Sequence, residues 1–491
     1  MYDNFTRRSV LKRACVAAGV GGLFLSGGRV GAVTGAATGP TLYVGSNDDQ
    51  LYALDATTGS RHWTFTAENM VRSSPTVVDG TVYFGAEGGE MYAVDAESGE
   101  QEWAFTDPPN GVVSSPTVVG GRVYFGAVND TVYALDAESG EQEWAFETEG
   151  TVHSSPMVVD GRVYVASHLP MDGFDFPLGV YAIDAESGDE LLTFTTSTAT
   201  VTSSPLVVDD MLYIGSHDRS MYAFDTTTGD LEWTYETVGF IEGSPTVVDG
   251  TLYIGSYDHE TQNGVGGMVY ALDAESGDEQ WSVPIDDGID SSPTVVDDTV
   301  YIGSGSGSND GAVHAFDAHT GDDVWTYEIG NRVESSPTVV DATVFVGAND
   351  NHVYALDAST GDRRWSYETD HSVYSSPTVA LEPSDGDSVD SRVRLGTLGH
   401  HEGLWLPMDE TLAVGGNGED GDATAGDDAS SEDSGSSGDD NGLDDDDDGS
   451  SGDGDDSLPG FGFVTGAAGV GVGAYLLERN RQCVDSTAEQ S

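Results

Sequence analysis

Short apolar runs separated by polar turns recur along most of the chain. In SSPTVVDGTVYFGAEGGEMYAVDAESGEQEW, residues 73–103, and the two residues that follow, the runs are PTVV, TVYFGA, EMYAVDA and EQEWAF. Their valine and aromatic content is typical of β-strands, and Asp79-Gly80 and Ser98-Gly99 are typical of the turns between strands. Apolar side chains stand on both sides of TVYF, which predicts a sheet sandwiched between neighbouring sheets.

This four-strand unit returns along the chain. Each copy contains a Ser-Pro pair, whose prolines are Pro75, Pro116, Pro156, Pro205, Pro245, Pro293, Pro337 and Pro377. Consecutive prolines are 40 to 49 residues apart, which is the period of one four-stranded blade of a β-propeller. The repeat therefore predicts eight copies of one blade.

A second motif places an aspartate, a glycine four residues later and a tryptophan eight residues later. We expect the aspartate to hold the turn and the tryptophan to pack on the neighbouring blade. In the fourth of the eight copies, Leu192 stands at the tryptophan position after Asp184 and Gly188. The tryptophans are Trp63, Trp103, Trp144, Trp233, Trp281, Trp325 and Trp365.

The segment VYALDAESGEQEWAF and its copies resemble the quinoprotein, or PQQ-type, β-propeller repeat over about residues 41–409. The resemblance implies an all-β, eight-bladed β-propeller of four-stranded antiparallel blades. TLYVGSNDDQLYALDATTGSRHWTF supplies only strands two to four of a unit, whereas SSPTVA at 375–380 is a first strand without a blade. We therefore predict that the N- and C-terminal strands pair and close the ring; RVRLGTLGHHEGLWLP is left over or displaces N-terminal strands.

The two ends of the chain resemble targeting signals. Arg7 and Arg8 in TRRSVLK precede an apolar run and predict a twin-arginine signal over residues 1–37, with an uncleaved anchor as the alternative. The predicted propeller, residues 38–414, precedes an acidic stalk at 415–457. Pro459, Gly460 and Phe461 open a segment, 458–482, that resembles an archaeal PGF-type sorting signal or membrane segment, and 483–491 is a short tail. These features predict export and anchoring at the cell surface through the C-terminus.

The net charge of the chain limits the classes of molecule that it could bind. The formal net charge is −69, with 86 acidic and 17 basic residues, and Lys12 is the one lysine. Such acidity argues against a nucleic-acid partner. Low lysine with abundant aspartate and glutamate resembles proteins of extreme halophiles; an acidic secreted protein of a mesophile is the alternative.

Three function classes stay open at this stage. Relatedness to quinoprotein dehydrogenases would imply an adjacent cysteine pair, a stacking tryptophan, calcium and a carboxylate base, but the chain has only Cys15 and Cys483. We therefore assign no catalytic residue and expect no cofactor; PQQ with calcium belongs to the dehydrogenase alternative. A glycan- or peptide-binding module would use exposed aromatics such as Phe174, Tyr257 and Tyr374. A monomeric surface scaffold needs only a rigid disc on a stalk.

No metal site is predicted. His400, His401 and Glu402 are the one dense cluster of metal-type ligands, but three adjacent residues in a loop make a poor site without outside partners. An exposed loop is the preferred interpretation of this segment.

The copies differ mainly at two kinds of position. Loops between strands two and three vary, at 168–179, 257–267 and 305–310, whereas the opposite turns are near-constant apart from 381–391. Because both variable positions fall at one end of an up-and-down blade, we predict that this face binds a surface protein or glycan partner. We take the variable residue before the Ser-Pro pair to be Arg72, Ser114, His153, Thr202, Glu242, Asp290, Glu334 and Tyr374.

Overall fold

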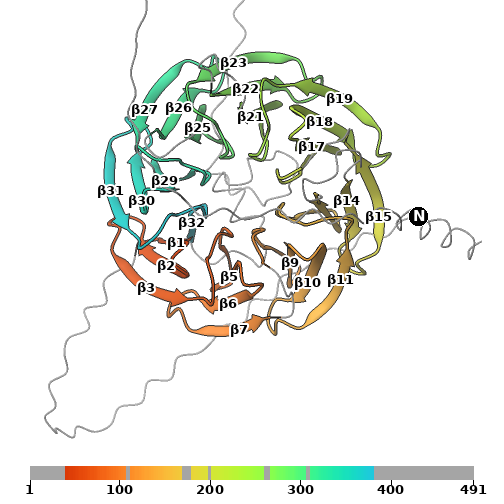
Figure 1. The fold of residues 1–491 in the computed structure, drawn as a ribbon, viewed down its shortest axis with the longest axis vertical. Coiled ribbons are helices and arrows are strands. Elements are labelled where there is room, and N and C mark those ends of the chain that lie inside the picture. Colours follow the sequence, from red (N-terminus) through yellow and green to blue (C-terminus); the bar gives the residue numbers. More distant parts are fainter. Residues whose placement is uncertain are drawn as a thin grey trace, which may run out of the picture. The chain divides into compact units, whose positions relative to one another are not determined.

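A computed structural model describes residues 39–106, 111–168, 179–196, 201–258, 266–305 and 310–380. Within these ranges the chain forms eight four-stranded antiparallel sheets, placed as blades around a central axis, and no helix (Figure 1). The predicted fold class is confirmed. The described ranges accordingly contain no helix that could cross a membrane.

The blades are numbered here along the chain, and blade 1 is the sheet that contains both β1 and β32. Blade 1 consists of β32 (Thr378–Ala380), β1 (Thr41–Gly45), β2 (Gln50–Asp55) and β3 (Arg61–Thr66). Blade 2 consists of β4 (Thr76–Val78), β5 (Thr81–Gly85), β6 (Met91–Asp95) and β7 (Gln101–Phe105). Blade 3 consists of β8 (Thr117–Val119), β9 (Arg122–Ala127), β10 (Thr131–Asp136) and β11 (Gln142–Glu147). Blade 4 consists of β12 (Met157–Val159), β13 (Arg162–Ala166), β14 (Gly179–Asp184) and β15 (Glu190–Thr195).

The other four blades repeat the same order. Blade 5 consists of β16 (Leu206–Val208), β17 (Met211–Gly215), β18 (Ser220–Asp225) and β19 (Leu231–Glu236). Blade 6 consists of β20 (Thr246–Val248), β21 (Thr251–Tyr257), β22 (Gly267–Asp273) and β23 (Glu279–Ile285). Blade 7 consists of β24 (Thr294–Val296), β25 (Thr299–Ser304), β26 (Ala312–Asp317) and β27 (Asp323–Glu328). Blade 8 consists of β28 (Thr338–Val340), β29 (Thr343–Ala348), β30 (His352–Asp357) and β31 (Arg363–Glu368).

The ring closes as the sequence predicts. The last strand, β32, pairs antiparallel with β1, so that Thr41, Leu42 and Tyr43 face Ala380, Val379 and Thr378. Blades 2 to 8 are continuous in sequence, and blade 1 combines the two ends of the described chain (Figure 1). Closure leaves no blade without a neighbour on either side.

A ring of serine hydrogen bonds joins the innermost strands. The serine directly before each repeat proline donates its backbone N–H to the side-chain oxygen of the equivalent serine in the next blade, at 2.9–3.0 Å. The hydrogen bonds run through Ser74, Ser115, Ser155, Ser204, Ser244, Ser292, Ser336 and Ser376, and from Ser376 back to Ser74. The Ser-Pro repeat is therefore an interblade linkage.

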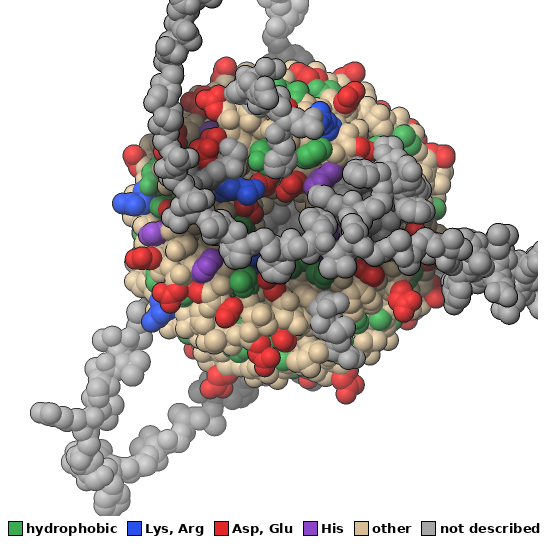
Figure 2. Space-filling view, viewed as in Figure 1, with side chains coloured by type: hydrophobic (Ala, Val, Ile, Leu, Met, Phe, Trp, Pro, Cys, Tyr) green, Lys and Arg blue, Asp and Glu red, His purple; other side chains and the backbone are tan. Residues whose placement is uncertain are grey.

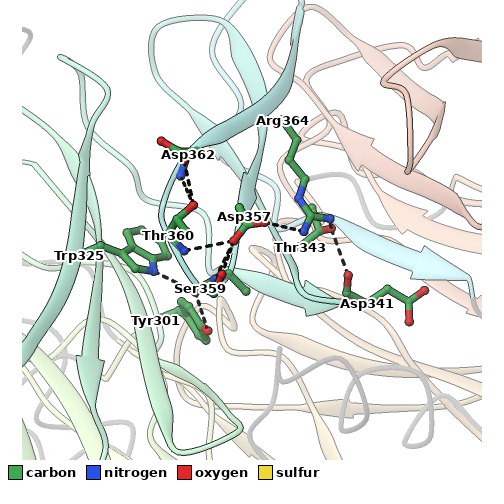
Figure 3. Close-up of polar contacts among 10 residues, drawn as sticks. Tyr301, Trp325, Asp341, Thr343, Asp357, Ser359, Thr360, Asp362 and Arg364 are labelled. Carbon is green, nitrogen blue, oxygen red and sulfur yellow. Dashed lines mark hydrogen bonds and ion pairs between the residues drawn. The ribbon is translucent and has the colours of Figure 1, made fainter.

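The tryptophans link the outer strands of neighbouring blades, as predicted. Trp325 donates its indole N–H to the carbonyl oxygen of Ala358 in the next blade at 2.8 Å, and the Tyr301 hydroxyl donates to the same oxygen at 3.2 Å (Figure 3). Seven tryptophans make this bond, and Trp365 closes the ring by donating to Ala56.

The aspartate of the motif holds the turn that receives the tryptophan. Asp357 accepts hydrogen bonds from the Ser359 backbone and hydroxyl and from the Thr360 backbone, and Arg364 contacts its other oxygen (Figure 3). These donors, the Ser359 hydroxyl foremost, lower the pKa of Asp357. The turn brings Gly361, with φ of 74°, against the indole, where a Cβ would lie 2.8 Å from Trp325. Glycine meets both the backbone and the space requirement.

Two blades lack part of the tryptophan and tyrosine pair that donates to this carbonyl oxygen. In blade 4, where Leu192 stands at the tryptophan position, Arg162 donates to the Thr226 carbonyl at 2.9 Å. In blade 8, Phe345 stands at the tyrosine position and Trp365 alone donates to Ala56 at 3.0 Å. Every equivalent carbonyl around the described ring therefore receives at least one side-chain donor, as buried backbone groups require.

Where a tryptophan and a tyrosine donate to the same carbonyl oxygen, the fold should tolerate loss of either donor better than loss of both. We expect Trp325→Phe and Tyr301→Phe each to lower the free energy of unfolding by about 1 kcal/mol, and the double variant by more than the sum, because the Ala358 carbonyl then loses both side-chain donors. Urea denaturation of the four proteins measures the coupling. Strict additivity would contradict the shared role.

Several predictions concern residues outside the described ranges. These are the twin-arginine signal, the stalk, the sorting signal, the His400–Glu402 cluster, Phe174 and the 381–391 loop. They stay predictions.

Candidate functional site

Both variable positions lie at one end of the blades, as predicted. Residues at the ends of second strands hydrogen-bond to segments that lead into first strands: His168 N–H donates to Thr151 O at 2.9 Å, and Asn349 N–H to Arg332 O at 2.9 Å. Phe240 and Tyr257 exchange two such bonds at 2.8 Å. We call this end of the described propeller the mouth face.

The near-constant turns lie at the opposite end. Ala96, in the turn after β6, donates its backbone N–H to Gly80, in the turn before β5, at 2.8 Å. Because β5 and β6 are antiparallel and Thr81 pairs with Asp95, the start of β5 and the end of β6 lie side by side, and so do these two turns. Viewed down the propeller axis, acidic side chains spread over the visible face, with a few basic and histidine side chains among them (Figure 2).

One predicted residue of the mouth face is wrong. Ser114 is 1% exposed, and its hydroxyl donates to Gly126 O at 2.8 Å, as that of Ser73 does to Gly85. Ser114 is thus the buried equivalent of Ser73, and Val113 holds the variable position in this copy. Counted back from the proline, the variable residue stands three positions before it in the other copies, whereas Ser114 stands only two positions before Pro116, so the repeat itself assigns the position to Val113.

An acidic and arginine cluster joins blades 6, 7 and 8. Arg332 contacts Asp290 through its terminal nitrogen and lies 3.3 Å from Glu334 through Nε. Glu334 also accepts a 3.0 Å hydrogen bond from the Asn349 amide. Two of these residues, Asp290 and Glu334, come from the predicted set. Arg332 and Asn349 were missed, because contacts between different repeats leave no signal in the sequence.

A second cluster lies across the seam where the ring closes. Arg72 binds Glu87 at 2.7 Å and donates to Asn47 Oδ1 at 3.2 Å. Its guanidinium lies 4.9 Å from the centroid of the Tyr374 ring, which is a cation–π contact. Arg72 and Tyr374 are 302 residues apart in sequence, and closure brings them together.

Histidines form a third cluster, over blades 4 to 6. The rings of His153 and His168 meet edge to face at 4.4 Å. His217 Nε2 lies 3.1 Å from Thr202 Oγ1 and 3.7 Å from Glu242 Oε1. Burial, together with the nearby His217, lowers the pKa of His168, which favours its neutral form. Among the described residues, no group of three histidine, cysteine or acidic side chains has the arrangement of a metal site.

The carboxyl group of Glu242 on this face has a displaced pKa. Burial, with the Asp290 carboxylate second, raises the pKa of Glu242 to about 7; Arg332 opposes this rise and Glu334 adds to it. The side chain is nevertheless 35% exposed, so solvent screens part of the cost of its charge.

Removing this carboxylate should change how stability depends on pH. The folded pKa lies above the ordinary 4.5, so the folded state holds the proton more tightly and loses stability as pH rises from about 4.5 to about 7. We expect Glu242→Gln to gain stability relative to the wild type across that window and to keep the gain above it. Urea midpoints over a pH series, with exposed Glu97→Gln as control, measure this; an equal difference at every pH would refute it.

The repeats and their closure define this protein as an eight-bladed β-propeller of PQQ-like repeats. The family model described as outer membrane protein assembly factor BamB matches residues 8–118, 106–173, 177–262 and 265–392. The chain belongs to this family. No curated protein matches it.

Three solved structures show how widely this fold is shared. BamB from Moraxella catarrhalis is 19% identical, with 66% of this chain and 92% of BamB covered and a TM-score of 0.51. The computationally designed Ika8 protein is 18% identical, with coverage of 65% and 95% and a TM-score of 0.54. Quinohemoprotein alcohol dehydrogenase from Comamonas testosteroni is 17% identical, with coverage of 71% and 75% and a TM-score of 0.51. At these identities the similarity shows the fold alone.

Proposed function

We propose that the protein is a non-catalytic binding scaffold at the cell surface, and that its mouth face binds a protein or glycan partner. The observation that carries the proposal is the contrast between the two ends of the propeller. One end repeats the same aspartate–glycine turns, whereas the other presents arginine, histidine, acidic and tyrosine side chains in three clusters.

The chemistry of the mouth face suits a polar partner. Arg72, Tyr374 and Glu242 are held by neighbouring side chains while remaining at least partly open to solvent. Side chains that are already positioned lose little conformational freedom on binding, which favours affinity. The family's description as an outer membrane assembly factor supports an assembly role. The twin-arginine signal predicted at 1–37 and the sorting or membrane segment predicted at 458–482 are the sequence features behind the proposed export and surface anchoring.

The alternative is a PQQ-dependent dehydrogenase. The fold is shared with a quinohemoprotein alcohol dehydrogenase, and a shared fold alone does not assign an activity. The full sequence holds only Cys15 and Cys483, so the adjacent cysteine pair implied by that resemblance has no counterpart.

Replacement of four mouth residues tests the proposal. Arg72, His153, Glu242 and Tyr374 are changed together to alanine, and Glu97, Glu138, Glu186 and Glu275 on the opposite turns form the matched control. We expect the mouth variant to lose capture of surface components from a cell-envelope extract while its melting temperature in molar salt stays within a few degrees of wild type. The control should keep capture.

Two outcomes would overturn the proposal. Capture that survives in the mouth variant and disappears in the control would place binding on the opposite face. Binding of PQQ with calcium, followed by the absorbance of the purified protein, together with alcohol-dependent dye reduction would favour the dehydrogenase.

A further inference from the structure

Aromatic pairs fill the outer part of most interfaces between blades. A tyrosine on the third strand of one blade packs against an aromatic residue on the fourth strand of the preceding blade, with ring centroids 5.2–6.0 Å apart. The pairs are Tyr367–Tyr52, Phe65–Tyr92, Phe105–Tyr133, Phe146–Tyr181, Tyr235–Tyr270 and Tyr327–Tyr354. Between blades 4 and 5, Phe194 packs on Phe224 at 5.5 Å instead.

The interface between blades 6 and 7 departs from this rule at both positions. Val283 stands where the fourth-strand aromatic residue belongs, and His314 stands where the third-strand tyrosine belongs. Both replacements are smaller than the residues that they replace. A pocket of about 310 Å³ lies at this interface and is lined by both residues.

His314 forms a fixed wall of the pocket. Its Nε2 lies 2.8 Å from the Ser304 hydroxyl and its Nδ1 lies 3.3 Å from the Thr326 hydroxyl. Its ring stacks on Phe316 at 5.8 Å, 10° from parallel. Burial lowers the pKa of His314 to about 4, so the imidazole is neutral near pH 7. Both ring nitrogens thus have partners within the protein, and the ring is held in place.

The remaining lining divides into an apolar part and an acidic part. The apolar part comprises Val283, Pro284, Ile285, Ala312 and Phe316. The acidic part comprises Asp286, Asp287, Asp323 and Glu328. No arginine or lysine is among the described residues that line the pocket.

We propose that this interblade pocket binds a small organic ammonium compound. Its apolar portion would lie against Val283 and Phe316, and its positive group would face the carboxylates of Asp286 and Glu328. Apolar walls with a few charged groups to fix orientation are the usual composition of small-molecule sites, and the volume falls at the lower end of their range. The pocket lies outside the three mouth clusters and is independent of the proposed scaffold function.

Calorimetry with a matched series of probes tests the charge preference. Benzylammonium, benzyl alcohol and benzoate share one ring and differ in charge. With the full chain in a fixed salt buffer, we expect benzylammonium to bind at least tenfold more tightly than benzyl alcohol, and benzoate to show no binding. No measurable binding of benzylammonium, or equal affinity for the alcohol, would overturn the proposal.

Restoring the aromatic pair tests the location. Val283→Tyr with His314→Tyr reproduces the Tyr235–Tyr270 pair of the preceding interface and should weaken benzylammonium binding at least tenfold. Val324→Tyr is the matched control, because Val324 is exposed on the neighbouring β27 and lies outside the pocket lining. Unchanged affinity in the filled variant would overturn the proposal.

A second variant guards against failure of the filled variant to fold. Asp286→Asn with Glu328→Gln leaves the shape of the pocket while removing two charges. We expect it to weaken benzylammonium binding at least fivefold and to leave benzyl alcohol unaffected. Equal effects on the two probes would show that charge does not select the ligand, and would overturn the proposal.

Discussion

A chain that ends after Tyr374 should unfold at a much lower urea concentration than one that ends after Ala380. The two chains differ only in residues 375–380 and lack the same C-terminal part. The missing residues include β32, whose loss leaves β1 as an open edge and removes the buried Val379, which is 1% exposed.

The size of the effect follows from the contacts that these six residues make. Five side-chain hydrogen bonds link them to blades 1, 2 and 8: Gly45 to Ser375, Ser336 to Ser376, Ser376 to Ser74, Thr338 to Pro377 and Thr378 to Pro75. At about 1 kcal/mol each, these bonds alone contribute about 5 kcal/mol. The total stability of a folded domain is only about 5–15 kcal/mol, so the shorter chain should lose much of it.

The manner of unfolding is part of this expectation. Ser376 completes a ring that runs through all eight blades, so its loss should destabilise the ring as a whole. We expect tryptophan fluorescence and far-ultraviolet circular dichroism to report one common, shifted transition. Equal midpoints for the two chains would show that β32 contributes nothing to closure.

The fold could be predicted because each copy repeats the same local chemistry. The Ser-Pro and tryptophan motifs fixed the number of blades, and the missing first strand before Thr41 pointed to closure by residues 375–380. The sequence did not show that Arg162 replaces the tryptophan donor in blade 4, because that bond joins two copies through a residue outside the motif.

The candidate site was less accessible to sequence analysis. The variable position could be found from the repeat, and the wrong assignment of Ser114 is corrected by counting three residues back from Pro116, which gives Val113. The contacts between residues of the mouth face could not be found from the sequence. Arg332 and Asp290 are 42 residues apart, and β12 and β13 separate His153 from His168 in sequence. The interblade pocket did leave a signal, since aligning the copies shows Val283 and His314 as departures from aromatic positions.

Salt should have the second large effect on stability. The chain carries 86 acidic and 17 basic residues, and the described arginines can pair with only a few carboxylates, as Arg72 does with Glu87 and Arg122 with Glu143. The acidic side chains spread over the surface therefore repel one another (Figure 2). At 0.1 M salt this repulsion reaches about 10 Å, whereas at about 1 M it reaches only about 3 Å.

We therefore expect the melting temperature to rise steeply as KCl is raised from about 0.1 M to several molar, and the protein to lose structure in dilute buffer. The chain that ends after Ala380 lacks the acidic stretch at 415–457, so it separates the propeller from the predicted stalk. If its melting temperature rises with KCl as that of the full chain does, the repulsion lies within the propeller. Sucrose at equal osmolality is the control for general solvent effects, because it stabilises without screening charge. Full stability in dilute buffer, or an equal response to sucrose, would contradict a charge-based requirement for salt.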